Sequence, residues 1–483
     1  MSSGGSRNKH FPTLLSLCAL CVLCGETYSA DPGPWATYRG NPQRTGNTDN
    51  VAGPDKPAVL WAIKSQDHFI AAPVPVNDKL YISGLGGFNR PTISLYPLAP
   101  KGPKVEPVWF KSAPFLKLAS VSSPAVQGNV IVFGDGMHQD SGGILHCVTA
   151  DSGKPIWQLP LPGDLIHLEG GPTIANNRVY MGGGAAGIMC YELDKAMLDG
   201  KELDSATILK MQDEKWKQLQ AAFEKEKKVN PDLAIEPSDD QLLKPVPKKV
   251  WQVGQVKWHS DAPVNLVGDK LLAPTAFLDK EKVGERALYC LNAATGDTIW
   301  KRELALNPWG GASVSGDTVI VPGSTIGYYY NEIKGAKGNI TALDLATGNV
   351  KWTKDVPGGI VGCAAAADGL AVTVASDGKV RAFKLADGER AWLYDVKAPA
   401  FAPPAIAGGV VYMADLQGTV HAIDLKTGTG KWVLPLSKDP AVMAPGMVYG
   451  GVTVHGGKLY VATANLEGPF ARKDTAVVCI GSK

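Results

Sequence analysis

ALDLATGNVKW, residues 342–352, sets a small residue, a glycine six positions later and a tryptophan four positions beyond that. The spacing recurs in CVTADSGKPIW (147–157), CLNAATGDTIW (290–300), AFKLADGERAW (382–392) and AIDLKTGTGKW (422–432). It is typical of a β-hairpin whose first strand turns the small residue inward and whose glycine takes positive φ at the turn. The second strand then carries the tryptophan.

Trp352, Trp392 and Trp432 follow one another at intervals of 40 residues, a period that predicts a radially repeated sheet. Degenerate copies raise the count to eight, with tryptophan at 61, 109, 157, 251, 300, 352, 392 and 432. Trp61 has no strand before it, and we expect its partners to be KLYVATA (458–464) and AVVCIGS (476–482). The sequence therefore predicts an all-β fold, an eight-bladed β-propeller closed by pairing of N- and C-terminal strands, with one helical insertion.

Five cysteines follow residue 30. Cys147, Cys190, Cys290 and Cys479 occupy the repeat position that alanine holds at 342, 382 and 422. We expect them to be small core residues, too far apart from blade to blade for disulfide bonds.

The pattern Ala-x-Asp-x-x-Thr-Gly-x-x-x-Trp, best kept at 342–352, resembles the tryptophan-docking repeat of quinoprotein-like propellers. WATYRGNPQRTG (35–46) resembles the opening segment of bacterial secreted proteins of the PQQ-like repeat family. That family includes PQQ-dependent alcohol dehydrogenases and the BamB-type scaffold that assists outer-membrane β-barrel assembly. The resemblance implies the fold and leaves the activity open.

The first thirty residues have the pattern of a secretory signal peptide. Arg7 and Lys9 precede the apolar run FPTLLSLCALCVLC (11–24), which contains Cys18, Cys21 and Cys24, and small residues follow at 27–30. We therefore expect a periplasmic or secreted protein with a signal peptide (1–30), an N-terminal opening segment (31–58) and the propeller (59–483). The apolar run is too short for a transmembrane segment, and a formal charge of +2 without basic runs argues against nucleic-acid binding.

With the strands of a blade lettered A to D from the axis outward, B-to-C loops and D-to-A connections share one face, here called the top face. GDGMHQDSGG (134–143) is a B-to-C loop, and LPLPGDLIHLEGGPTI (159–174) is the next D-to-A connection. We predict that His138 lies within reach of His167 or Glu169. Imidazoles with carboxylates suit a divalent metal, and the candidate ligands are Asp135, His138, Asp140, His167 and Glu169.

Most connections into inner strands are small or apolar, but IHLEGGP (166–172), KWHSDAP (257–263) and NPWGGAS (307–313) are not. They belong to consecutive blades and should line one sector of the axial funnel. The candidate ligand-binding residues are His167, Glu169, Trp258, His259, Asp261 and Trp309. The alternative is a solvated rim, where such side chains cost nothing.

Three tyrosines, 328–330, lie within the top loop STIGYYYNEIKGAKG (324–338). They indicate either a recognition surface or a twisted edge with one buried tyrosine.

Residues 195–249 interrupt the third complete blade between its C and D strands. SATILKMQDEKWKQLQAAFEKEKK (205–228) predicts a helix with Ser205 as its N-cap and an apolar stripe of Leu209, Trp216, Leu219 and Phe223. We expect this stripe to dock on the propeller. The alternative is that it meets a partner.

Two functions follow from the resemblance and the top-face residues. The first is a ligand-binding or protein-assembly platform of the cell envelope, expected to be a monomer with a protein, small-molecule or sugar ligand on the top face; a metal- or glycan-binding propeller would use the same residues. The alternative is a PQQ-dependent dehydrogenase, in which Trp258 or Trp309 stacks on the quinone, Glu169 holds a cation and Asp261 is the catalytic base. Family dehydrogenases carry two adjacent cysteines over the cofactor, and this sequence has no such pair.

Overall fold

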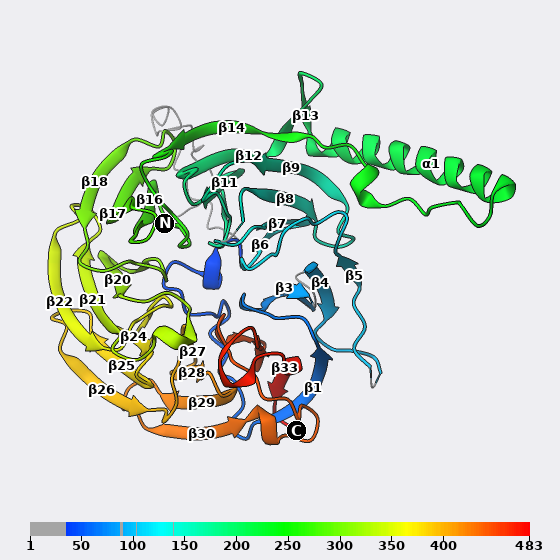
Figure 1. The fold of residues 1–483 in the computed structure, drawn as a ribbon. Helices are drawn as coiled ribbons and strands as arrows, with labels where there is room; N and C mark the ends of the chain where they lie inside the picture. The colour runs from blue at the N-terminus through cyan, green and yellow to red at the C-terminus, as the bar shows by residue number, and fades with distance from the viewer. Residues whose placement is uncertain (1–34, 87–89, 103, 139) are drawn as a thin grey trace, which may run out of the picture.

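The computed structural model describes residues 35–86, 90–102, 104–138 and 140–483, which form eight antiparallel sheets around a common axis. Figure 1 shows the sheets arranged as a closed ring with the inner strands nearest the axis. The predicted eight-bladed propeller is confirmed. The predicted signal peptide, with Cys18, Cys21 and Cys24, lies outside the described residues.

Blades are numbered in chain order, and their strands run outward from the axis. Blade 1 contains β2 (Val74–Val76), β3 (Lys79–Gly86), β4 (Arg90–Pro97) and β5 (Trp109–Lys111). Blade 2 contains β6 (Ala125–Gln127), β7 (Val130–Gly134), β8 (Gly143–Thr149) and β9 (Pro155–Leu161). Blade 3 contains β10 (Thr173–Ala175), β11 (Arg178–Gly182), β12 (Ile188–Leu198), β13 (Lys201–Asp204) and β14 (Val246–Val253). Blade 4 contains β15 (Asn265–Val267), β16 (Lys270–Leu278), β17 (Val283–Asn292) and β18 (Thr298–Glu303).

The second half of the ring repeats this order. Blade 5 contains β19 (Ser313–Ser315), β20 (Thr318–Ser324), β21 (Lys337–Asp344) and β22 (Val350–Pro357). Blade 6 contains β23 (Ala365–Ala367), β24 (Leu370–Ala375), β25 (Lys379–Lys384) and β26 (Arg390–Asp395). Blade 7 contains β27 (Ala405–Ala407), β28 (Val410–Ala414), β29 (Thr419–Asp424) and β30 (Gly430–Pro435). Blade 8 contains β31 (Thr453–His455), β32 (Lys458–Ala462), β33 (Thr475–Gly481) and, as its outer strand, β1 (Ala58–Ser65).

Blade 8 closes the ring as predicted. β1 pairs antiparallel with β33, and Trp61 lies opposite Cys479. Every sheet therefore has a neighbour on each side, and the edges left free are short outer strands.

The repeated tryptophans join each blade to the next. Seven of the eight indole N–H groups donate to a backbone carbonyl of the following blade, and that of Trp432 donates to Pro54, just before β1, all at 2.8 to 3.1 Å. The repeat glycine has a second use beyond its positive φ, because the preceding blade's tryptophan packs against it. A Cβ placed on Gly388 (φ +71°) would lie only 2.6 Å from the ring of Trp352. The spacing of the motif thus encodes contacts between blades as well as the hairpin.

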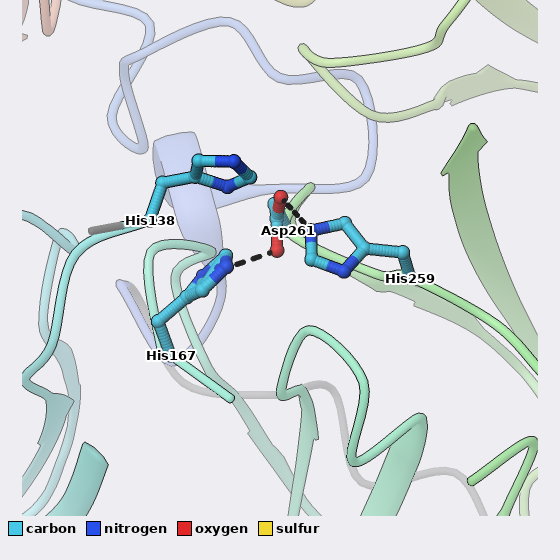
Figure 2. A group of neighbouring side chains, drawn as sticks. All are labelled: His138, His167, His259 and Asp261. Atoms are coloured by element: carbon cyan, nitrogen blue, oxygen red, sulfur yellow. Dashed lines mark hydrogen bonds and ion pairs between the residues drawn. The ribbon is translucent and has the colours of Figure 1, made fainter. Parts of the chain in front are cut away.

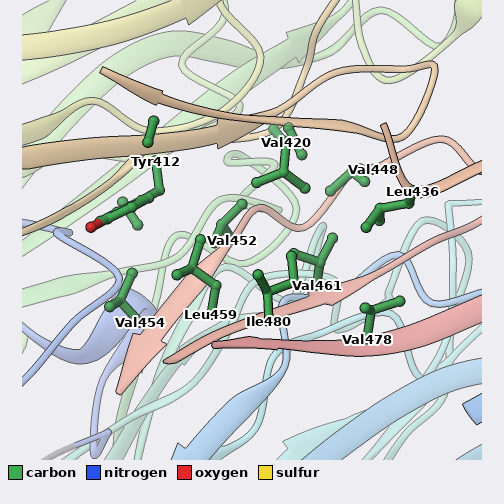
Figure 3. Packing of buried hydrophobic residues seen from close by; sticks show 14 of the residues in the cluster. Tyr412, Val420, Leu436, Val448, Val452, Val454, Leu459, Val461, Val478 and Ile480 are labelled. Carbon is green, nitrogen blue, oxygen red and sulfur yellow. The ribbon is translucent and has the colours of Figure 1, made fainter. Parts of the chain in front are cut away.

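The core lies between the blades, as Figure 3 shows for the valine-rich contact of blades 7 and 8. Ala422, at the small position of its repeat, is buried in that contact. All five cysteines of the described chain are buried and free, which confirms the expectation drawn from the repeat.

The opening segment runs through the centre of the ring (Figure 1). Its backbone carbonyls accept hydrogen bonds from the middle residue of six inner strands. The donor–acceptor pairs are Val126–Trp35, Ile174–Ala36, Val314–Pro42, Ala366–Gln43, Ile406–Thr45 and Val454–Gly46. Asn265 of blade 4 donates its side-chain amide to Pro42 as well. One short stretch thus ties seven blades together.

Two arginines of this segment are fully buried on the axis. Arg39 donates to the carbonyls of Pro404 and Val452, and Arg44 donates to those of Val264 and Tyr38. Guanidinium groups suit this position because each offers five N–H donors to several carbonyls at once. The sequence of residues 35–46 indicated the family resemblance, but no pattern in it predicted that the segment lies on the axis.

The insertion begins with the β13 hairpin and continues as α1 (Ser205–Val229). Asp204, and not the predicted Ser205, is the N-cap, and it accepts a hydrogen bond from the backbone N–H of Thr207. Asp outranks Ser here because β13 ends at Asp204 in the extended conformation that an N-cap requires.

Only the first turns of α1 dock on the propeller, where Ile208 is buried against the core of blades 2 and 3. Gln212 exchanges two hydrogen bonds with the backbone of Leu243 in the return segment. The rest of α1 projects away from the ring (Figure 1), and its Leu219 and Phe223 face Ile235 and Pro237 of the return segment. The expected docking of the whole stripe therefore holds only for its beginning.

α1 is not apolar enough to cross a membrane, and neither is any other helix among the described residues.

Candidate functional site

Three top-face segments from neighbouring blades interlock at one seam. They are the B-to-C loop of blade 2 (135–142) and the connections into the inner strands of blade 3 (162–172) and blade 4 (254–264). The N–H of Gly142 donates to the carbonyl of Ile166, which ties the first segment to the second. Gly184 pairs through both backbone groups with Ser260, which ties the third segment to the B-to-C loop of blade 3.

Gly184 shows why this seam is tight. Its φ is +55°, and a Cβ placed there would lie 2.2 Å from the carbonyl oxygen of Leu165. Only glycine allows both the conformation and the approach. The backbone of the segment that carries His167 is thereby held against the neighbouring blade.

The seam brings together His138, His167, His259 and Asp261, which we call the histidine cluster (Figure 2). One potential ligand atom from each of the four lies within 4.8 Å of the others. The ring centroid of His167 lies 5.1 Å from that of His138 and 5.1 Å from that of His259. The backbone N–H of His138 also donates to Glu169 at 2.5 Å, so the predicted proximity of His138 to His167 and Glu169 is confirmed.

The cluster is largely buried, and several of its nitrogen and oxygen atoms have no hydrogen-bond partner. His167 and His259 are fully buried, and neither ring nitrogen of His167 has a hydrogen-bond partner in the protein. His259 Nε2 lies 2.7 Å from Asp261 Oδ2, but its Nδ1 and the other oxygen of Asp261 are unpartnered. Each unmet buried polar atom costs about 1–3 kcal/mol. A solvated rim does not describe these residues.

Burial and charge act together on the ionisable groups. Burial lowers the pKa of His167 against the opposing effect of Asp261. Burial acts to raise the pKa of Asp261, but His259 and His167 together lower it. Burial, with the charge of Asp261, raises the pKa of Glu169 to about 8. The seam therefore favours the neutral form of His167 beside a charged Asp261.

The other predicted metal ligands lie nearby but are engaged elsewhere. Asp135 forms a fully buried pair with His146, 2.9 Å apart, and accepts a hydrogen bond from the backbone of Ile144. Asp140 accepts a hydrogen bond from the backbone N–H of Met137. Both carboxylates thus hold the B-to-C loop in shape and place His138.

The two predicted tryptophans do not face the cluster as a stacking pair. Trp258 packs on Tyr289 of its own blade, with ring centroids 4.0 Å apart. Trp309 packs against the apolar cluster of the next sector, which includes Ile326 and Phe401. Of the six predicted ligand-binding residues, the seam gathers His167, Glu169, His259 and Asp261.

Tyr38, on the axial segment, was not predicted as a site residue. It belongs to a single 3₁₀ turn (Tyr38–Gly40), and a Cβ on Gly171, close to Glu169 in the chain, would lie 3.2 Å from its ring. Tyr328, which is 37% exposed, packs its ring against Phe401 and Tyr449 and donates its hydroxyl to the carbonyl of Val361. A segment so far away in the chain gave no local signal for this role.

The tyrosine run is split between exposure and packing. Tyr329 is 46% exposed, whereas Tyr330 packs under Gly468 and donates its backbone N–H to Glu467. The loops 325–336 and 465–474 therefore meet each other over the top face.

Family dehydrogenases imply a quinone with a hard cation, and the residues here do not fit that group. Hard cations such as Ca²⁺ take about six to eight oxygen ligands, whereas this cluster offers three imidazoles and one carboxylate. Trp258, the expected stacking residue, is occupied by Tyr289, and Cys363 near the axis is a single buried thiol. We therefore assign no quinone chemistry to the site.

Solved structures share the fold at low identity. BamB from Moraxella catarrhalis matches with a TM-score of 0.57 and 15% identity, over 89% of this chain and 98% of that one. A europium-containing methanol dehydrogenase matches with a TM-score of 0.58 and 12% identity, over 94% and 98%. The quinohemoprotein alcohol dehydrogenase ADHIIG from Pseudomonas putida matches with a TM-score of 0.55 and 13% identity, over 93% and 80%. These likenesses establish the propeller architecture and do not choose between activities.

Sequence comparison is more specific about the family. No curated protein matches the chain. The family profile described as outer membrane protein assembly factor BamB matches residues 52–212 and 284–479, which together make up most of the sequence. The chain belongs to this BamB family of PQQ-like β-propellers.

Proposed function

We propose that this chain is an exported propeller of the cell envelope that acts as a ligand-binding or protein-assembly platform, with its binding site at the histidine cluster. The observation that carries the proposal is the meeting of side chains from three consecutive blades, with buried atoms of His167, His259 and Asp261 that lack a hydrogen-bond partner. A buried polar atom without a partner lowers stability, and a bound ligand that pairs the atoms gathered at this seam would remove that cost.

The envelope location is supported by the signal-like first thirty residues and by the family description, which names outer-membrane protein assembly. One face can serve both as a surface for a protein partner and as a site for a small ligand, because the loops that would contact a partner also surround the histidine cluster. A protein partner or a small polar ligand on the top face would meet the same residues.

The test is native mass spectrometry of the mature protein, purified gently from the envelope of its own host, beside the double variant His167→Ala Glu169→Ala. We expect the wild-type protein to carry a ligand or a protein partner that the double variant has lost. Circular dichroism should show both proteins folded, with a lower unfolding midpoint in the double variant, which has lost a buried ring and its bound partner. A bare chain in both samples, or a double variant that unfolds, would contradict a binding role for the seam.

The alternative is a quinoprotein dehydrogenase, which the shared architecture with the methanol and alcohol dehydrogenases favours. The donor set argues against it. Added mass equal to a quinone and a divalent cation in the same spectrum would replace the platform proposal with this one.

A further inference from the structure

We infer that the histidine cluster binds one divalent transition-metal ion of the zinc class, through one imidazole nitrogen from each histidine and one oxygen of Asp261. The inference rests on the proposed function, because it names the ligand of the same top-face site.

The spacing of the donors suits a single ion. Donors around tetrahedral zinc lie roughly 2.0–2.1 Å from the metal and so roughly 3.3 Å from one another. Nδ1 of His167 lies 3.4 Å from Oδ1 of Asp261, which matches this spacing. Nε2 of His259 is hydrogen-bonded to Oδ2 of Asp261 at 2.7 Å, a contact that a bound ion would replace. Because all four ligand atoms fall within 4.8 Å of one another, small side-chain rotations bring them onto one centre.

The unpartnered atoms supply an independent observation. His167 is fully buried and lacks a hydrogen-bond partner at both ring nitrogens, and one oxygen of Asp261 is also unpartnered. Figure 2 shows the three rings and the carboxylate directed toward one another from separate segments. The contacts of Asp261 with His259 and His167 thus leave Nε2 of His167 and Nδ1 of His259 without a hydrogen-bond partner.

The donor types select the class of ion. Imidazole suits zinc, copper, iron and nickel, whereas magnesium and calcium require mostly oxygen ligands. Charge agrees with this choice, because the buried carboxylate of Asp261 offers a negative charge to a dication.

The arrangement also gives the ion a way in. His167, His259 and Asp261 stand on the rigid seam, whereas His138 is 31% exposed on the B-to-C loop of blade 2. Glu169, 29% exposed and 4.0 Å from His167 Nδ1, lies beside the proposed ion and faces solvent. An external ligand that approaches the ion would meet this carboxylate.

The experiment is calorimetric titration of the chelator-treated full chain with Zn²⁺ alone, with metal analysis of the dialysed product. We expect one Zn²⁺ per chain. Binding should weaken at least a hundredfold in Asp261→Asn and at least tenfold in His138→Ala, which changes a part-exposed residue and should fold normally. His421→Gln is the control, because His421 is a buried histidine beside Asp415 in blade 7, outside the cluster, and its replacement should leave zinc binding unchanged.

Absence of a single site, or binding that both cluster variants keep, would overturn the metal assignment. The two proposals fail separately. If zinc does not bind but the native spectrum shows an organic ligand or protein partner that depends on His167 and Glu169, the metal assignment is wrong and the platform stands. If neither is seen, both are wrong.

Discussion

At the scale of single residues, the repeat glycine meets two requirements. The turn needs positive φ, and the tryptophan of the neighbouring blade leaves no room for a Cβ. Gly388 has φ +71° and would bring a Cβ to 2.6 Å from Trp352, whereas Gly369 has φ +75° and would bring its Cβ near nothing. We predict that Gly369→Ala costs about 1–2 kcal/mol of unfolding free energy, the cost of the left-handed conformation.

Gly388→Ala should cost about 1–3 kcal/mol more, because the methyl group must displace the ring. Chemical denaturation of the two variants measures the difference. Equal losses would show that Trp352 does not constrain the glycine.

The buried histidines allow a similar comparison of partnered and unpartnered groups. His146 and His167 are both fully buried, but His146 has Asp135 at one nitrogen and Gln158 at the other, while His167 has no hydrogen-bond partner. Alanine leaves a cavity of similar size at either position. We predict that His146→Ala destabilises the metal-free protein by at least about 2 kcal/mol more than His167→Ala does, since only His146 loses hydrogen bonds.

Denaturation in the presence of a chelator tests this prediction. A larger loss for His167→Ala would mean that this ring holds the seam together, and the cluster would then be structural.

The residue scale also shows the reach of sequence patterns. His167, Glu169, His259 and Asp261 could be predicted because each breaks a run of small residues at the same point of a repeat. Asp135 was grouped with them because it shares a loop with His138, yet its carboxylate pairs with His146, which follows eleven residues later on the next strand. Spacing along a loop does not say to which side a carboxylate turns.

At the scale of elements, α1 projects from the ring and contacts the propeller only through its first turns. Ile208 and Gln212 are its buried residues, and the distal half contacts its own return segment. We predict that replacing residues 215–236 with a five-residue glycine–serine linker shifts the thermal unfolding midpoint by no more than a few degrees.

Ile208→Ala is the comparison, because it empties a site in the core of blades 2 and 3 and should cost about 2–4 kcal/mol. Thermal unfolding followed by circular dichroism measures both. A deletion as damaging as Ile208→Ala would show that the projecting half supports the ring.

The helix could be predicted from its periodicity, but its contacts could not. The stripe of Leu209, Trp216, Leu219 and Phe223 is the same whether a helix lies on a domain or on its own return segment. The axial segment is a harder case, since it holds the blades through backbone carbonyls, which no side-chain pattern reports.

At the scale of the whole molecule, many tyrosines are buried between blades. Burial raises the pKa of Tyr81, Tyr180 and Tyr412 to about 12 from an ordinary value of 10. A phenol whose pKa is higher in the folded state favours folding fully below pH 10, and this contribution is lost as the pH rises from 10 to about 12. We predict cooperative alkaline unfolding in that window.

Absorbance at the tyrosinate band, followed with circular dichroism, checks this prediction. The phenols should ionise together with the loss of structure. Arg39 and Arg44 act in the opposite direction, because burial lowers the pKa of both, that of Arg44 to about 10, but they are two groups against several. Tyrosines that titrate near pH 10 in a protein that stays folded would contradict the prediction.

The central segment has a consequence for how the chain is made. This segment is synthesised early, but Asn47 donates its side-chain amide to the carbonyl of Val454, which is made 407 residues later. β1 pairs with β33, which is made later still. At about 5–20 residues per second, that interval lasts roughly 20–80 s. Until the last blade is present the ring cannot close, so β1 lacks its partner strand and the axial segment lacks part of its hydrogen bonds. Maturation therefore ends in one late step, when the final blade captures both the axial segment and the first strand.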